Sequence, residues 1–215
     1  MLLAGVRPWD EFPRTVREAI RRRVEAGMGL VLVDLEARQA SDLAALSPLE
    51  PGERGGRSAR WRVTREHYIT RNVPLEALPF DQMRHRRSKA RGDVLLESEA
   101  GEPILAVGQA GSGRLVAAAW EQRGFIPLIE NQWGARATWP YWEYLYSLLA
   151  RALVWAARKE PAAALETLAL DEATHPGRVR IAATAPASLT VTVRDEYGES
   201  EQETVLAFPG QREAK

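Results

Sequence analysis

The stretch from residue 104 to residue 157 most constrains the fold, because it places several expected elements in one fixed order. It begins with the apolar run ILAV, turns at Gly111-Ser112-Gly113 and continues with RLVAAAW. An aromatic-rich loop follows, and residues 141–158 repeat apolar side chains at the spacing of an amphipathic helix. Two strands around a short glycine turn predict a β-hairpin rather than a phosphate loop, since no helix directly follows the glycines.

The first 34 residues predict a pair of parallel strands. Residues 2–6 are a short apolar run typical of a strand buried on both faces. Residues 12–24 repeat apolar side chains at helical spacing, and residues 29–34 form a second apolar run. A strand, a helix and a strand joined by short links form a βαβ unit, in which the strands run parallel.

The pattern changes near Pro161, where an all-β region is expected to begin. About 50 residues remain beyond it, fewer than the roughly 100 of a complete immunoglobulin-like sandwich. We therefore expect an α/β domain over residues 1–160 and a partial β-sandwich over residues 166–215. Its expected strands cover residues 166–170, 178–184, 189–194 and 204–208.

Composition excludes several classes of function. Lys plus Arg and Asp plus Glu number 29 each, so no overall charge attracts nucleic acid. There is no cysteine, which excludes disulfides and thiolate chemistry. The three histidines are too scattered to predict a metal site, and no cofactor is expected. No apolar run approaches the ~18 residues of a membrane span, so we expect a soluble chain, cytoplasmic unless an upstream export signal exists.

Four segments together resemble the class I glutamine amidotransferase-like superfamily, in particular its trehalose-utilisation (ThuA-like) branch. They are RRRVEAGMGLVLVD, HYITRNVPLEALPF, AVGQAGSGRLVAAAW and YWEYLYSLLARALVWAA. The resemblance covers roughly residues 1–158. It implies a flavodoxin-like (Rossmann-like) α/β fold, with a mostly parallel sheet and flanking helices.

The chain departs from this superfamily at the catalytic positions. The resemblance implies a cysteine nucleophile on the turn where Asp34 stands, and a histidine near Glu121, where none occurs. An aspartate cannot replace the thiolate that attacks a glutamine amide. Glutamine hydrolysis is therefore not expected, although the ThuA-like branch also commonly lacks the cysteine. The superfamily normally carries one or two further βα units before the strand at residues 2–6, so that strand is expected to have an unpaired edge.

Polar residues follow the expected strand ends, where ligands bind in open α/β sheets. They are Asp34, Glu36, Glu121 and Arg123. Paired carboxylates there would suit acid/base work on a sugar. The alternative is that these side chains solvate loops or cap helices.

Aromatic residues offer a second candidate site. Trp120, Trp133 and Trp139 have flat faces that could stack on sugar rings, or could pack against the helix after them. His67 is either a base in a pocket or a structural residue. The basic run at residues 84–91 is interpreted as a solvated edge strand rather than a phosphate or nucleic-acid site.

Three functions remain open. The first is a non-catalytic binding or interaction module with a sugar or glycan as ligand, in bacterial carbohydrate or envelope processes. The second is a ThuA-like carbohydrate-active enzyme that uses Asp34, Glu36 or Glu121 as acid or base. The third is a structural domain that is completed by a protein partner, or by a further copy of itself, through unpaired sheet edges.

Overall fold

A computed structural model of the chain divides it into two compact units, Met1–Glu160 and Pro161–Lys215, which we describe separately. The residues described are 2–4, 11–34, 42, 45–57, 60–75, 84–120, 128–130, 136–138, 142–161, 165–170, 179–183, 185, 187–194, 197–198 and 200–207.

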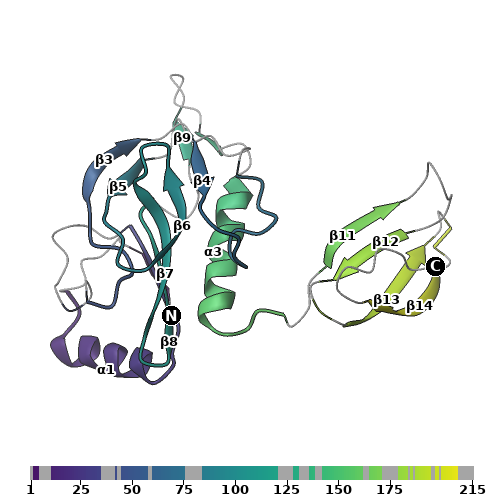
Figure 1. Cartoon of the computed structure of the whole chain (residues 1–215), viewed down its shortest axis with the longest axis horizontal. Coiled ribbons are helices and arrows are strands. Elements are labelled where there is room, and N and C mark those ends of the chain that lie inside the picture. The colour runs from purple at the N-terminus through teal and green to yellow at the C-terminus, as the bar shows by residue number, and fades with distance from the viewer. Residues whose placement is uncertain are drawn as a thin grey trace. The chain divides into compact units, whose positions relative to one another are not determined.

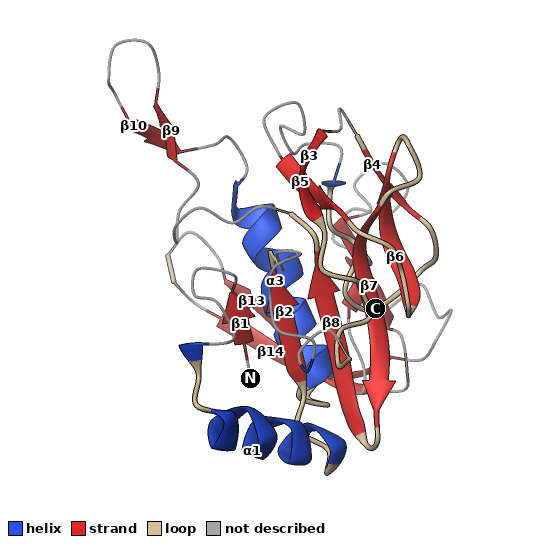
Figure 2. Cartoon of the chain, turned by 90° about the vertical axis from the view of Figure 1, so that its left-hand side faces the viewer, coloured by secondary structure: helices blue, strands red, loops and turns tan. Residues whose placement is uncertain are grey.

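The first unit is built on a six-stranded sheet of order β1-β2-β8-β7-β6-β4 (Figure 2). From one edge to the other, the strands are Leu2–Ala4, Leu30–Val33, Gly113–Ala118, Pro103–Ala110, Asp93–Ser98 and Trp61–Val63. β1, β2 and β8 are mutually parallel. β8, β7, β6 and β4 pair in antiparallel fashion. The parallel β1–β2 pair and the β7–β8 hairpin are thus confirmed.

The prediction of a flavodoxin-like, mostly parallel sheet is wrong. Three of the five pairings in this sheet are antiparallel and two are parallel. The reason is local, because tight turns after Ser98 and Ala110 reverse the chain without the crossover helix that a parallel pairing requires. The described part of the chain contains two longer helices, α1 (Arg14–Glu25) and α3 (Trp142–Ala156).

Two separate apolar clusters cover the two faces of the sheet. Ile20 and Val24 of α1 pack with Leu30 and Leu32 of β2. Val31 of β2, whose side chain points to the opposite face, packs in the cluster that contains α3. Figure 1 shows α1 and α3 on different sides of the β7–β8 hairpin. Burial on both faces explains why β2 reads as an unbroken apolar run.

The hairpin turn is held against the end of α1, which is why it needs glycine. Gly111 has φ +55°, and a Cβ built on it would lie 2.4 Å from the carbonyl oxygen of Glu25. The N–H of Ser112 donates to that same oxygen at 2.9 Å. A Cβ on Gly113 would lie 2.1 Å from the carbonyl oxygen of Val24.

The other described strands form two-stranded antiparallel sheets. In the first unit, β3 (Glu53–Arg57) pairs with β5 (Arg84–Arg87), and β9 (Leu128–Glu130) pairs with β10 (Arg136–Thr138).

The second unit is all-β in its described part, with strands close to the expected positions. β11 (Leu165–Leu170) pairs with β12 (Val179–Ala183), and β13 (Ala187–Arg194) pairs with β14 (Ser200–Ala207).

Candidate functional site

Asp34 lies directly after β2, at the carboxyl end of the parallel strands. Its backbone N–H donates to the carbonyl oxygen of Ala118 at 3.0 Å, so the ladder with β8 continues for one residue. Its φ is 60°, in the left-handed region, which Asp tolerates better than most residues. The residue is 6% exposed. The turn that the resemblance assigns to a nucleophile therefore carries a buried carboxylate.

Arg86 forms an ion pair with this carboxylate. Its Nε donates to Oδ1 of Asp34 at 2.5 Å, and the two side chains are 3% and 9% exposed. The backbone N–H of Arg86 donates to the carbonyl oxygen of Ala119 at 2.8 Å, which fixes β5 across the end of β8. A charge-assisted hydrogen bond away from water is strong, and removing one partner leaves an uncompensated buried charge. The carboxylate of Asp34 thus has a structural role, because it binds the buried guanidinium of Arg86.

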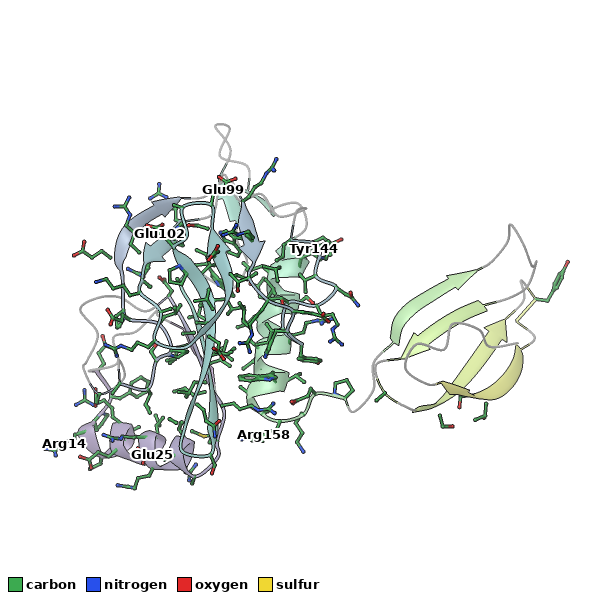
Figure 3. All side chains as sticks on the ribbon, in the orientation of Figure 1. Arg14, Glu25, Glu99, Glu102, Tyr144 and Arg158 are labelled. Atoms are coloured by element: carbon green, nitrogen blue, oxygen red, sulfur yellow. The ribbon has the colours of Figure 1, made fainter. Side chains whose placement is uncertain are left out.

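His85, the neighbour of Arg86 in β5, contacts a second carboxylate, that of Glu102. Its side chain is fully buried, and Nε2 lies 2.6 Å from Oε2 of Glu102. Oε1 of Glu102 lies 3.5 Å from Nε of Arg87. Figure 3 labels Glu102 at the end of the sheet far from α1. Nδ1 of His85 is buried and makes no hydrogen bond within the described residues.

The His85–Glu102 pair has the form of a base and its orienting carboxylate. A base must reach a substrate, however, and the side chain of His85 is 0% exposed. The imidazole is therefore closed to solvent in this structure, whereas the side chain of Glu102 is 29% exposed.

Trp120 lies in the core beside these pairs. It is 2% exposed, and its ring stacks on Trp61 with centroids 5.8 Å apart and planes at 20°. It also forms an isolated bridge with His85. One face of the Trp120 ring is covered by the indole of Trp61, so that face is not available to stack on a sugar. Ligand binding by Trp120 stays a prediction.

His67 has a structural environment. Its Nδ1 accepts a hydrogen bond from the N–H of Ile69 at 3.2 Å, and its ring meets Trp155 edge-on at 5.1 Å. Burial, and then the charges of Arg65 and Arg114, lower the pKa of His67 below its ordinary value. The neutral ring, with Nδ1 as an acceptor, is the form that this turn requires.

Arg151 of α3 holds the segment that contains His67. Its Nη1 donates to the carbonyl oxygens of Tyr68 and Arg71 at 3.0 and 2.8 Å. Its guanidinium also lies over the ring of Tyr68, 5.6 Å from the centroid.

The remaining predicted site residues lie outside the described residues. They are Glu36, Glu121, Arg123, Trp133 and Trp139. Within the described ranges, no group of three or more His, Cys, Asp or Glu side chains could hold a metal ion. None of the helices in these ranges has the length and hydropathy of a membrane span.

Sequence reasoning missed Arg86 as the partner of Asp34, and it missed the contact between His85 and Glu102. The basic run was interpreted as solvated, and that description fits the exposed Arg84 and Arg87. The two middle residues of β5 are buried. The signal was present in the sequence, because a strand that crosses the end of a sheet must place some side chains inward.

No family model matches the chain, and no curated protein matches it. Among solved structures it is similar to a cytoplasmic protein from Salmonella typhimurium, with TM-score 0.48 and 16% identity over 68% of this chain and 62% of that one. A second cytoplasmic protein, from Salmonella typhimurium LT2, has TM-score 0.42 and 18% identity over 67% and 59% of the two chains. The match to a β-galactosidase from Bacillus circulans sp. alkalophilus has TM-score 0.43 and 14% identity, and covers 97% of this chain and 30% of that one.

The chain thus spans less than two thirds of the length of each of these proteins. The likenesses are distant in identity and in TM-score.

Proposed function

We propose that the chain is a non-catalytic, glutamine amidotransferase-like domain that serves as a binding or interaction module in bacterial carbohydrate or envelope processes. The observation that supports it is the buried ion pair between Arg86 and Asp34. It occupies the turn to which the resemblance assigns a nucleophile. The chain also has no cysteine to act there.

A sugar or glycan is the ligand class that the sequence favours. The sequence predicts a loop with Gly and Pro around Trp133 and Trp139, from which aromatic faces could be presented to a sugar ring. Trp120 is buried, and its ring stacks on Trp61. The stacking surface of the proposal is therefore assigned to Trp133 and Trp139.

The non-catalytic part of the proposal is tested by two assays on the full chain. Release of ammonia from glutamine and hydrolysis of a panel of aryl glycosides are measured for the natural sequence and for Asp34→Asn. Both proteins are expected to give the rate of buffer alone. Turnover by the natural sequence would instead establish an enzyme, and its loss in an Asp34→Asn protein shown to be folded by circular dichroism would assign Asp34 to the reaction.

The binding part is tested by calorimetric titration with a panel of neutral oligosaccharides. Trp133→Ala and Trp139→Ala are each expected to weaken binding about tenfold, the loss of one stacking surface. Tyr197→Ala is the matched control, because Tyr197 is an aromatic residue that is 84% exposed in the second unit. Saturable binding that neither tryptophan variant alters, or no binding across the panel, would refute the glycan ligand.

The ThuA-like enzyme is the weaker alternative. It needs Asp34, Glu36 or Glu121 as an acid or base, and Asp34 is engaged by a buried guanidinium. Glu36 and Glu121 lie outside the described residues, so the separation of the carboxylates remains a prediction.

A domain completed by a partner chain is the other alternative. It is favoured by the position of β1, which within the described residues is an outer strand of the sheet and pairs with β2 alone. Exposed strand edges invite pairing with another chain. Light scattering across a concentration series tests it, and a stable monomer with a sharp unfolding transition would contradict it.

A further inference from the structure

A cavity of about 360 Å³ lies against the polar side of α1. Figure 3 shows α1, with Arg14 labelled, at the end of the first unit away from Glu102. The cavity shares no residue with the Asp34–Arg86 pair. It is lined by Arg14, Arg17, Glu18, Arg21, Asp42 and Leu46.

Three arginines reach this cavity from one face of the helix. Arg14, Arg17 and Arg21 are spaced by three and four residues, so their side chains are neighbours on the helix surface. Like charges at this spacing destabilise a helix. Glu18, Asp42 and Glu25 offset part of this repulsion.

Carboxylates hold each of these arginines through Nε. The distances are 2.7 Å for Arg14 to Glu18, 3.3 Å for Arg17 to Asp42 and 2.9 Å for Arg21 to Glu25. The contact of Arg17 lacks hydrogen-bond geometry, and its Nε is buried without a hydrogen-bond partner in the described residues. No Nη group of the three arginines makes a hydrogen bond within those residues.

The Nη ends are the part of a guanidinium that binds an oxyanion in a bidentate way. Among the described residues, the side chains that line the cavity carry three positive and two negative charges, and Glu25 beside them pairs with Arg21. Leu46, which is 5% exposed, supplies an apolar wall. The volume lies at the lower end of the ~300–1,000 Å³ of small-molecule sites and exceeds what a bare phosphate ion fills.

We propose that this cavity binds a small phosphate monoester, with the Nη groups of Arg14, Arg17 and Arg21 around the phosphate and the organic part against Leu46. The site is independent of the function proposed above, because it uses another face of the first unit and none of the same residues.

The test is calorimetric titration of the full chain with glucose 6-phosphate, glycerol 3-phosphate, inorganic phosphate and glucose. At least one ester is expected to bind saturably, inorganic phosphate at least about threefold more weakly, and glucose not at all. Equal affinity for inorganic phosphate would assign the cavity to the free ion and overturn the ester. Absence of saturable binding by both esters would overturn the site.

Variants of the helix locate the binding. Arg17→Gln and Arg21→Gln are each expected to weaken the ester about tenfold, through loss of a charged hydrogen-bond donor. Arg23→Gln is the matched control, because Arg23 is exposed on the same helix and does not line the cavity. It is expected to change the affinity by less than about twofold. An equal loss in all three variants would show general charge attraction and overturn the site.

Asp42→Asn keeps the test decisive if the arginine variants fold poorly. Removal of this carboxylate takes away the anion that competes for Arg17, so the ester is expected to bind about threefold or more tightly. Unchanged or weaker binding in a folded Asp42→Asn protein would contradict the proposal.

Discussion

Nε2 of His85 lies 2.6 Å from Oε2 of Glu102, although His85 belongs to β5 and Glu102 to the turn before β7. The contact joins the small β3–β5 sheet to the main sheet. It stands beside the Arg86–Asp34 pair, so two successive residues of β5 each bind a carboxylate from the main sheet.

The ring of His85 is expected to contribute to stability more by packing than by its hydrogen bond to Glu102. His85→Ala should lower the free energy of unfolding by about 3 kcal/mol, because it opens a cavity at a fully buried site. Glu102→Gln should cost only about 1 kcal/mol, since it keeps the shape and a hydrogen-bonding oxygen. Urea denaturation measures both values. A loss in Glu102→Gln as large as that in His85→Ala would mean that the contact with Glu102 matters more than the packing of the ring.

Breaking the Arg86–Asp34 pair should be strongly destabilising. Arg86→Met should lower the free energy of unfolding by about 3–5 kcal/mol, because it leaves the Asp34 carboxylate buried without its guanidinium. The double variant with Asp34→Asn should cost less than the sum of the two single changes.

Arg62→Gln is the control for this experiment, since it breaks an ion pair with Glu97 in which Arg62 is 75% exposed. A cost below about 1 kcal/mol is expected there. Equal losses in the free energy of unfolding for Arg62→Gln and Arg86→Met would contradict the claim that burial makes the Arg86–Asp34 pair important for stability.

His67 should make the protein less stable in mild acid. Its pKa is lower in the folded state than the ordinary value of 6.5, because burial disfavours the charged ring. The unfolded chain therefore binds the proton more readily. Stability is complete above pH 6.5 and falls as the pH drops from there towards the folded-state pKa.

His67→Gln, which keeps an acceptor for the N–H of Ile69, should flatten this slope. Urea midpoints of both proteins at pH 5.5, 6.5 and 7.5 give the comparison. Parallel slopes would remove His67 as the cause.

Gly111 should tolerate no side chain. Gly111→Ala combines a left-handed backbone with a contact of 2.4 Å to the carbonyl oxygen of Glu25, and should cost about 3 kcal/mol or more. Gly101→Ala separates the two effects, because Gly101 has φ +78° but no atom within 4 Å of a built Cβ. It should cost only about 1–2 kcal/mol, the strain of the backbone alone. Thermal and urea unfolding measure both, and equal losses would mean that the clash is relieved.

The sequence predicted the β1–α1–β2 unit, the β7–β8 hairpin and α3, because each carries its own periodicity or turn, but it did not predict β3, β4, β9 or β10. Leu30 to Val33 are apolar throughout since both faces are covered, and Gly111-Ser112-Gly113 marks a hairpin. The overall strand order was not predictable in the same way. The resemblance favoured a mostly parallel sheet, whereas the chain adds β7, β6 and β4 by reversals.

The candidate site was predicted only in part. Asp34 was identified from its place after a strand, but its partner Arg86 lies 52 residues further along the chain. Trp120 was assigned to a ligand because nothing near it in sequence reveals Trp61 as a stacking partner. The Asp34–Arg86 and Trp120–Trp61 contacts both join segments that are far apart in the sequence and come together only in the folded protein. Hydrophobic periodicity does not report such contacts.

The single guanidinium of Arg151 binds two carbonyl oxygens of a segment that is mostly turn, at Tyr68 and Arg71. A stretch with few ladder hydrogen bonds of its own would normally exchange its amide protons quickly. Because Arg151 binds this segment to α3, we expect the segment to open only when these hydrogen bonds to α3 break. The amides of residues 68–71 and those of α3 should therefore become accessible to deuterium in a single cooperative event.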